Sequence, residues 1–303
     1  MGAYLDRPIT ESHYDYGKND KIKYVAASMQ GWRTEQEDAH NAILDLEKGI
    51  HMFAVYDGHG GKDVSTYTAD HFPQYLIQQE NWKNKEFSNA LNDAFISFDD
   101  VLRQPEVLKI LNSGTTACVV VIHNENITVA NAGDSRAVLC RNGKAIELSF
   151  DHKPEDKSEK SRIVKAGGTI SADGRVNGGL NLSRALGDHY YKQNKDLPLE
   201  EQMISAKPDI IEDKITDEDE FLIIACDGIW NSMSSQEVVD FVKELWGKET
   251  LKQICDKIMA NCLADNTDGD GTGCDNMTII IVDLKNTTEL GQFDNIEDTK
   301  QIE

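Results

Sequence analysis

The chain has 303 residues, 39% of them hydrophobic, which is enough for one large domain or two small ones with a sizeable core. Its formal net charge of −22 at pH 7 argues against nucleic acid as a partner, because phosphates are contacted by Lys and Arg. No apolar stretch approaches the roughly 18 residues that a membrane-spanning helix needs. The six cysteines form no Cys-x-x-Cys pair, which indicates reduced thiols in a cytosolic or nuclear protein.

The N-terminal residues 1–20 are polar, and we expect them to form a loosely tied arm. They contain no hydrophobic signal region. Gly2 is a candidate for myristoylation, although the motif calls for Ser or Thr where this chain has Asp6. A lipid at Gly2 would add membrane association to the expected cytoplasmic or nuclear location.

Short apolar runs with strand spacing predict β-strands over residues 21–29, 50–56, 116–123, 127–130, 136–140, 145–148, 210–215, 220–226 and 276–284. Helical spacing predicts helices over residues 64–76, 87–102, 154–166, 234–246 and 249–263. Pro73 is expected to kink or break the first helix, and Ser234 with Glu237 forms a capping box at the start of the fourth.

The stretch 151–205 is rich in charge and glycine, and we expect it to form a long functional flap. No Pro/Ser-rich linker divides the chain, so we predict one domain over residues 21–284, followed by an acidic tail, 285–303. Strands that follow strands, with paired helices inserted at two places, predict sheets packed together with helices outside.

Three aspartates lie at the ends of apolar runs and have small or polar neighbours: Asp57, Asp227 and Asp275. A carboxylate at the end of a buried strand is held rigidly at the rim of the core. Several together repel one another unless a positive charge lies between them, and clusters of oxygen ligands suit Mg²⁺ or Mn²⁺. The sequence therefore predicts a site for a hard metal on a β-scaffold.

Further polar residues surround these aspartates in the sequence. Gly58 follows Asp57, and its carbonyl could bind a metal, while His59 could donate a proton because its pKa lies near working pH. Arg33 offers a planar fork for phosphate, and Glu37 and Asp38 could bind metal directly or through water. By themselves, these last three residues are also compatible with an exposed charged turn.

Two more aspartates lie in short turns. Asp134 is compatible either with a tight turn or with a further metal ligand or a partner that orients His59. For Asp188, which follows Ser183-Arg-Ala-Leu-Gly, we expect a structural role.

In this order, the motifs resemble those of the metal-dependent type 2C protein serine/threonine phosphatases. The resemblance covers roughly residues 22–284 and rests on seven motifs: Met29-Gln-Gly-Trp-Arg-Thr-Glu-Gln-Glu-Asp-Ala-His40, Tyr56-Asp-Gly-His-Gly-Gly61, Ser113-Gly-Thr-Thr116, Ala132-Gly-Asp-Ser-Arg136, Ser183-Arg-Ala-Leu-Gly-Asp188, Ala225-Cys-Asp-Gly-Ile-Trp230 and Asp275-Asn276. The opening Met-Gly-Ala-Tyr-Leu-Asp-Arg-Pro resembles the alpha/beta branch of this family.

The resemblance implies an α+β fold, in which a central antiparallel β-sandwich is flanked by helices on both faces, with residues 155–200 as a flap beside the substrate cleft. It also implies two Mg²⁺ or Mn²⁺ ions per subunit, a weaker third ion, and phosphoserine and phosphothreonine proteins as substrates. The residues implied to contact the metals, directly or through water, are Asp57, Gly58, Asp227, Asp275, Glu37, Asp38 and Asp134.

By the same resemblance, Arg33 binds the phosphate, His59 protonates the leaving group, and Asp134 orients His59, helps to bind the third ion, or does both. Two cations about 3.5–4 Å apart lower the pKa of a shared water, which attacks phosphorus without a phospho-enzyme. We expect a signalling enzyme that works as a monomer.

The chain departs from the family pattern at two places. Asn231 stands where many members have an Asp, which weakens the third metal site because an amide is neutral. The tail, 285–303, is also too short for the helical extension of some alpha-type relatives.

Two other functions remain as alternatives. Asp268-Gly-Asp270-Gly-Thr272 matches the nucleophile motif of phosphatases that form an aspartyl phosphate, but no buried strand precedes it. A pseudophosphatase scaffold would have lost metal carboxylates or the phosphate-binding arginine, and this chain keeps them.

Overall fold

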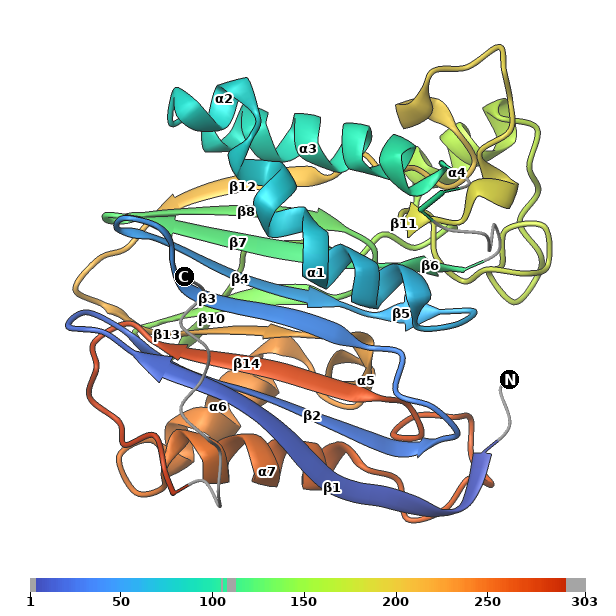
Figure 1. Cartoon of the computed structure of the whole chain (residues 1–303). Helices are drawn as coiled ribbons and strands as arrows, with labels where there is room; N and C mark the ends of the chain where they lie inside the picture. Colours follow the sequence, from blue (N-terminus) through green and yellow to red (C-terminus); the bar gives the residue numbers. More distant parts are fainter. Residues whose placement is uncertain (1–3, 105, 108–112, 293–303) are drawn as a thin grey trace.

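Two antiparallel β-sheets lie face to face at the centre of the protein, and helices cover the outer face of each (Figure 1). The computed structural model describes residues 4–104, 106–107 and 113–292. Every ladder between named strands in this part of the chain is antiparallel. The predicted α+β class, with sheets between helices, is confirmed.

The larger sheet has six strands, in the order β1 (Tyr4–Lys18), β2 (Lys23–Arg33), β14 (Met277–Asp283), β13 (Asp219–Ala225), β9 (Arg136–Arg141) and β10 (Lys144–Glu147). The second has five, in the order β12 (Asp209–Lys214), β8 (Asn126–Ala132), β7 (Ala117–His123), β4 (Ile50–Tyr56) and β3 (Ala39–Glu47). A third sheet joins three two-residue strands, in the order β11 (Leu186–Gly187), β6 (Gly114–Thr115) and β5 (Gly58–His59).

Strand β4 shows why the central strands read as continuous apolar runs. All seven of its residues are buried, and they alternate between two cores. Phe53 and Val55 pack into the core between the sheets, whereas Met52, Ala54 and Tyr56 face the helices on the other side. A strand that is covered on both faces therefore loses the apolar–polar alternation of a half-exposed strand.

The helices pack in two groups. The five-stranded sheet is covered by α1 (Asp63–Ile77), α2 (Glu80–Lys83) and α3 (Phe87–Leu102). The six-stranded sheet is covered by α5 (Asp227–Trp230), α6 (Ser235–Leu245) and α7 (Leu251–Cys262). The capping box of Ser234 and Glu237 is present as predicted. No helix in the described residues is long and apolar enough to cross a membrane.

The predicted break at Pro73 does not occur, because α1 runs through this residue. Proline has no N–H to donate to the carbonyl four residues earlier, which here belongs to Ala69. Asn41 on β3 donates its Nδ2 to that carbonyl at 2.9 Å and so replaces the missing hydrogen bond. Strand β3, which was not predicted, thus stabilises the helix above it.

The N-terminal residues also differ from the expected arm, because residues 4–18 form β1, the edge strand beside β2. Tyr14 and Tyr16 pack against the core beneath α7. The Tyr14 hydroxyl donates to Asp256 at 2.6 Å and accepts from Lys252 at 2.9 Å, which binds β1 to α7. A few aromatic anchors therefore order a segment whose other residues are mostly polar.

The predicted flap has a small core of its own. It contains α4 (Lys157–Lys165) and two short 3-10 helices, His189–Tyr191 and Leu199–Glu201. Five buried side chains pack together beneath α4: Ile163, Val176, Leu182, Ala185 and Ile204. The flap is therefore a folded unit beside the sandwich.

The described part of the predicted tail is attached to α7. The carbonyls of Glu289 and Leu290 accept hydrogen bonds from the backbone N–H groups of Leu251 and Lys252 in the first turn of that helix. The rest of the predicted tail, 293–303, lies outside the described residues, as does Gly2.

Candidate active site

The predicted site residues lie at one end of the sandwich, where strands end and the chain passes between the two sheets. Asp57 follows β4 of the five-stranded sheet. Asp227 follows β13, and Asp275 precedes β14, both in the six-stranded sheet. The connections that cross between sheets at this end carry the other carboxylates: Glu37 and Asp38 between β2 and β3, and Asp134 between β8 and β9.

These residues converge on one cavity of about 400 Å³. Eight of the nine predicted site residues line it: Arg33, Glu37, Asp57, Gly58, His59, Asp134, Asp227 and Asp275. The flap forms the opposite wall with Arg175, Tyr191 and residues 179–182. The ninth residue, Asp38, is close to Asp57 but does not line the cavity.

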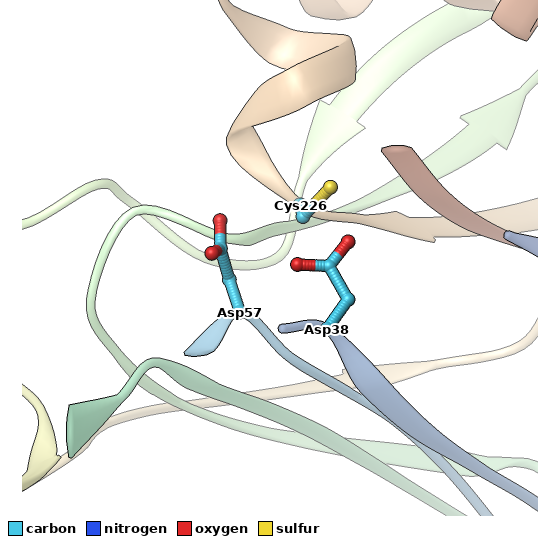
Figure 2. A group of neighbouring side chains, drawn as sticks. All are labelled: Asp38, Asp57 and Cys226. Atoms are coloured by element: carbon cyan, nitrogen blue, oxygen red, sulfur yellow. The ribbon is translucent and has the colours of Figure 1, made fainter. Parts of the chain in front are cut away.

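Ligand oxygens of different carboxylates approach one another closely. One oxygen each of Asp57, Asp134 and Asp227 lie within 4.8 Å of one another, and so do atoms of Asp38, Asp57 and the Cys226 thiol. Figure 2 shows Asp38 and Asp57 side by side, with Cys226 next to them. Asp57 therefore belongs to both groups, at the centre of the cluster.

Close backbone contacts fix the positions of these carboxylates. A Cβ on Gly58 would lie 2.2 Å from the Glu37 carbonyl oxygen, and one on Gly228 would lie 2.0 Å from the Asn276 carbonyl oxygen. Asn276 accepts a hydrogen bond from the Glu37 N–H at 3.0 Å. Its Nδ2 donates to the Gln30 and Glu35 carbonyls at 2.9 and 3.0 Å. Asn276 thereby joins the β2–β3 connection to β14.

The carboxylates perturb one another strongly. Burial raises the pKa of Asp57 well above its usual range, and the charges of Asp38 and Asp227 raise it further. Burial, assisted by neighbouring carboxylates, also raises the pKa of Asp38 to about 7 and that of Asp227 to about 8. The protein alone does not supply enough positive charge for this cluster.

Two basic side chains reach the cluster. Arg33 Nη2 lies 2.6 Å from Asp275 Oδ2, and Lys153 Nζ lies 2.5 Å from Asp134 Oδ2. Asn231 donates its Nδ2 to Asp227 at 2.9 Å without adding charge. Closely spaced oxygen ligands with an unbalanced negative charge are the donor set that hard divalent cations prefer, so the residues fit a metal.

His59 is held by a residue other than the one considered from the sequence. Its Nε2 lies 2.7 Å from Asp188 Oδ2, whereas Asp134 pairs with Lys153. Burial lowers the pKa of His59, but the charge and hydrogen bond of Asp188 outweigh that effect and raise it. The residue that contacts His59 is thus Asp188 and not Asp134, because the third sheet joins β5 to β11 through β6 and brings Asp188 to the histidine. The orienting role considered for Asp134 has no hydrogen bond to His59 behind it among the described residues, and its role stays a prediction.

Sequence reasoning gave no role in the site to Lys153, Asn276 or Cys226, and it expected only a structural role for Asp188. Cys226 and Asn276 directly adjoin Asp227 and Asp275, and that adjacency was a usable signal. Lys153 and Asp188 lie in loops far from their partners in sequence, so only the folded chain reveals their contacts.

The alternative motif does not reach the cavity. Asp268 and Asp270 are exposed and lie in the loop after α7, with no strand before them. The backbone N–H of Thr272 donates to Asp270 at 3.0 Å, as in an ordinary polar turn. A buried nucleophile at this position is therefore excluded.

A β-sandwich with a carboxylate cluster, an arginine and a histidine in one cavity defines the class of metal-dependent phosphate ester hydrolases. Comparison with known proteins makes the class specific. The profile of the family described as protein phosphatase 2C matches residues 22–271.

Individual relatives and a solved structure agree with this profile. The chain is 43% identical to "Probable protein phosphatase 2C 60" of Arabidopsis thaliana, over 95% of this chain and 93% of that protein. It is 42% identical to "Probable protein phosphatase 2C 6" of Paramecium tetraurelia, over 94% of this chain and 100% of that protein. A crystal structure of a phosphatase from Toxoplasma gondii superposes with a TM-score of 0.76 at 28% identity, covering 92% of this chain and 97% of that one.

The chain belongs to the protein phosphatase 2C family and is a metal-dependent serine/threonine protein phosphatase. The resemblance that the motifs indicated is confirmed.

Proposed function

We propose that the chain dephosphorylates phosphoserine and phosphothreonine proteins with two Mg²⁺ or Mn²⁺ ions bound in the cavity described above. The observation that carries this proposal is the convergence of carboxylates from both sheets on one cavity beside Arg33 and His59. The proposed direct ligands are Asp57, the Gly58 carbonyl, Asp227 and Asp275, while Glu37 and Asp38 hold metal-bound waters. Asp134 contributes to a weaker third site.

When bound, the cations offset the charge of the phosphate and lower the pKa of a water by several units. The remaining chemistry belongs to the chain. Arg33 is poised to bind the phosphate because its Nε is buried and has no hydrogen-bond partner in the described part of the chain. The same guanidinium pairs with Asp275, which holds its planar fork in the cavity.

His59 is proposed to protonate the oxygen that leaves with serine or threonine. The raised pKa favours the imidazolium that this step requires. Direct attack by water is supported by the lining of the cavity, in which the described residues include no Cys or Ser. The hydroxyl of Thr116 accepts from the Asp57 N–H and is hydrogen-bonded to Ser135, so it is committed to the scaffold.

The wider setting is part of the same proposal. Residues 21–284, together with β1 at the edge of the six-stranded sheet, act as one catalytic domain, and the flap beside the cavity contacts the substrate protein. The enzyme works as a monomer in signalling, in the cytoplasm or nucleus, and a myristoyl group at Gly2 would bring it to membranes. The support for the last point is the sequence Met-Gly at residues 1–2 and the likeness of the opening segment to the alpha/beta branch of the family.

The test is hydrolysis of a phosphothreonine peptide by chelator-stripped protein, titrated with Mn²⁺ and with Mg²⁺. The wild type is compared with Asp57→Asn and with Asp270→Asn as the matched control. We expect activity that requires metal, disappears in Asp57→Asn and survives in Asp270→Asn. Activity that disappears only in Asp270→Asn would favour an aspartyl phosphate, and none from folded wild type with either metal would favour a scaffold.

A further inference from the structure

The carboxylate of Asp188 is buried beside His59 and has no role in the chemistry proposed above. Asp188 is 1% exposed, and its Oδ2 lies 2.7 Å from His59 Nε2. Because Nε2 is occupied, Nδ1 is the ring nitrogen left to face a substrate. It has no hydrogen-bond partner among the described residues, while His59 lines the cavity.

The contact between His59 and Asp188 is made across the three-stranded sheet. β6 lies between β5, which carries His59, and β11, which directly precedes Asp188. The central residue is Gly114, and a Cβ there would lie 2.3 Å from Asp188 Oδ2 and 2.6 Å from His59 Nε2. Only glycine lets the imidazole and the carboxylate meet across this strand.

A second, buried network fixes the backbone that presents Asp188. The Asp188 N–H donates to the Ser113 carbonyl at 2.9 Å, and the Gly187 N–H donates to Asp99 Oδ1 at 2.7 Å. Lys192 Nζ donates to both oxygens of Asp99 at 2.9 Å and to the Ala185 carbonyl at 2.8 Å. Asp188 itself has φ of 53°, a left-handed conformation that Asp and Asn tolerate.

We propose that Asp188 is the positioning residue of His59: it holds Nε2–H and thereby aims Nδ1–H at the leaving oxygen of the phosphate ester. This inference rests on the proposed role of His59 as proton donor. A structural ion pair alone would not require a dedicated sheet with glycine at its centre, nor a histidine that also lines the catalytic cavity.

Water forms the new bond to phosphorus and passes one proton to solvent, and the bond from phosphorus to the seryl or threonyl oxygen breaks. That oxygen keeps the bonding pair and takes the Nδ1 proton. The ring is left neutral, with its remaining proton on Nε2 toward Asp188, and solvent returns the lost proton before the next turnover. Asp188 stays ionised throughout and orients the ring in one tautomer.

The test compares two substrates in the Mg²⁺-loaded enzyme: a phosphothreonine peptide, whose leaving group needs a proton, and p-nitrophenyl phosphate, whose leaving group does not. We expect Asp188→Asn to lower kcat on the peptide by roughly 10- to 100-fold and on p-nitrophenyl phosphate by less than about threefold. The double variant with His59→Gln should be no slower than His59→Gln alone, because both changes remove one function. Asp196→Asn, at an exposed position in the same region, is the charge-matched control.

Equal losses on both substrates, or losses that multiply in the double variant, would overturn the role of Asp188. The role of His59 is judged separately: if His59→Gln itself slows both substrates equally, the proposed proton donor is wrong. A measurement on the wild type avoids reliance on variant folding. In ¹⁵N-histidine spectra of the Mg²⁺-loaded protein we expect a hydrogen-bonded Nε2–H of His59, and a ring with no proton on Nε2 would also overturn the proposal.

Discussion

Gly228→Ala should weaken metal binding without touching a ligand. Gly228 follows Asp227 in α5, and its backbone conformation does not require glycine. Without a steric clash, alanine at this position would stabilise the helix. Its Cβ would lie 2.0 Å from the Asn276 carbonyl oxygen. Since such a carbon and oxygen normally lie about 3.3 Å apart, the two segments must separate by about 1.3 Å.

That separation acts directly on the metal site. Asp227 adjoins Gly228 and Asp275 adjoins Asn276, so the shift moves two proposed ligands apart. Asn276 cannot yield easily, because its side chain makes three hydrogen bonds, two to the β2–β3 connection and one to the Gln30 carbonyl in β2. We expect overpacking to cost about 1–3 kcal/mol of unfolding free energy and Mn²⁺ affinity to fall roughly 10- to 100-fold.

The assay is Mn²⁺ calorimetry on chelator-stripped protein, together with urea unfolding in EDTA. Gly269→Ala is the control, because a Cβ there meets nothing within 4 Å and the residue lies in an exposed loop. If Gly228→Ala lowers stability but binds Mn²⁺ as the wild type does, the two carboxylates are not coupled through this contact. If it changes neither quantity, the close approach of Gly228 to Asn276 does not constrain the site.

Three further predictions concern other parts of the structure. Arg33→Ala should raise KM for a phosphopeptide by roughly 10- to 100-fold with a smaller change in kcat, because a charged hydrogen bond to the phosphate is lost; steady-state kinetics would count against this role if KM stayed the same. Burial raises the pKa of Glu159, but Arg184 and Arg162 outweigh it and bring the pKa to about 2, below the usual 4.5. The stabilisation by ionised Glu159 is therefore complete above pH 4.5 and is lost as the pH falls from 4.5 to 2. Glu159→Gln should lower the unfolding free energy at pH 7 by about 3 kcal/mol and flatten the dependence of that free energy on pH between 4.5 and 2. Urea unfolding at several pH values measures both effects, and parallel curves for the variant and the wild type would contradict this expectation. Asn41→Ala should cost about 2 kcal/mol in the same assay, because the Ala69 carbonyl beneath Pro73 loses its donor and the buried Tyr56 hydroxyl loses its acceptor; an unchanged free energy would mean that water replaces Asn41 at both groups.

The placement of the carboxylates could be predicted because it depends on local pattern. Asp57, Asp227 and Asp275 each adjoin an apolar run, and a strand buried on both faces reads as such a run. Antiparallel neighbours then bring the ends of different strands to the same edge. What each carboxylate does in catalysis remains a prediction.

Elements that depend on distant partners could not be predicted in this way. The sequence of α1 contains a proline, and nothing near it reveals that Asn41 supplies the missing donor. Strand β1 has few apolar residues, and its order depends on Tyr14 meeting Lys252 and Asp256, more than 230 positions away. Asp188 looked structural because its contact with His59 spans 129 positions and is created by the third sheet.

The division of the carboxylates between the two sheets has a consequence for the lifetime of the fold. Asp57 follows a strand of one sheet, whereas Asp227 and Asp275 adjoin strands of the other, so an ion held by all three would link the two sheets. Such an ion binds only after the sheets have met, and at a free concentration 100 times its Kd it adds about 2.7 kcal/mol to the unfolding free energy. The supply of divalent cation would then set how long each molecule survives as well as how fast it works.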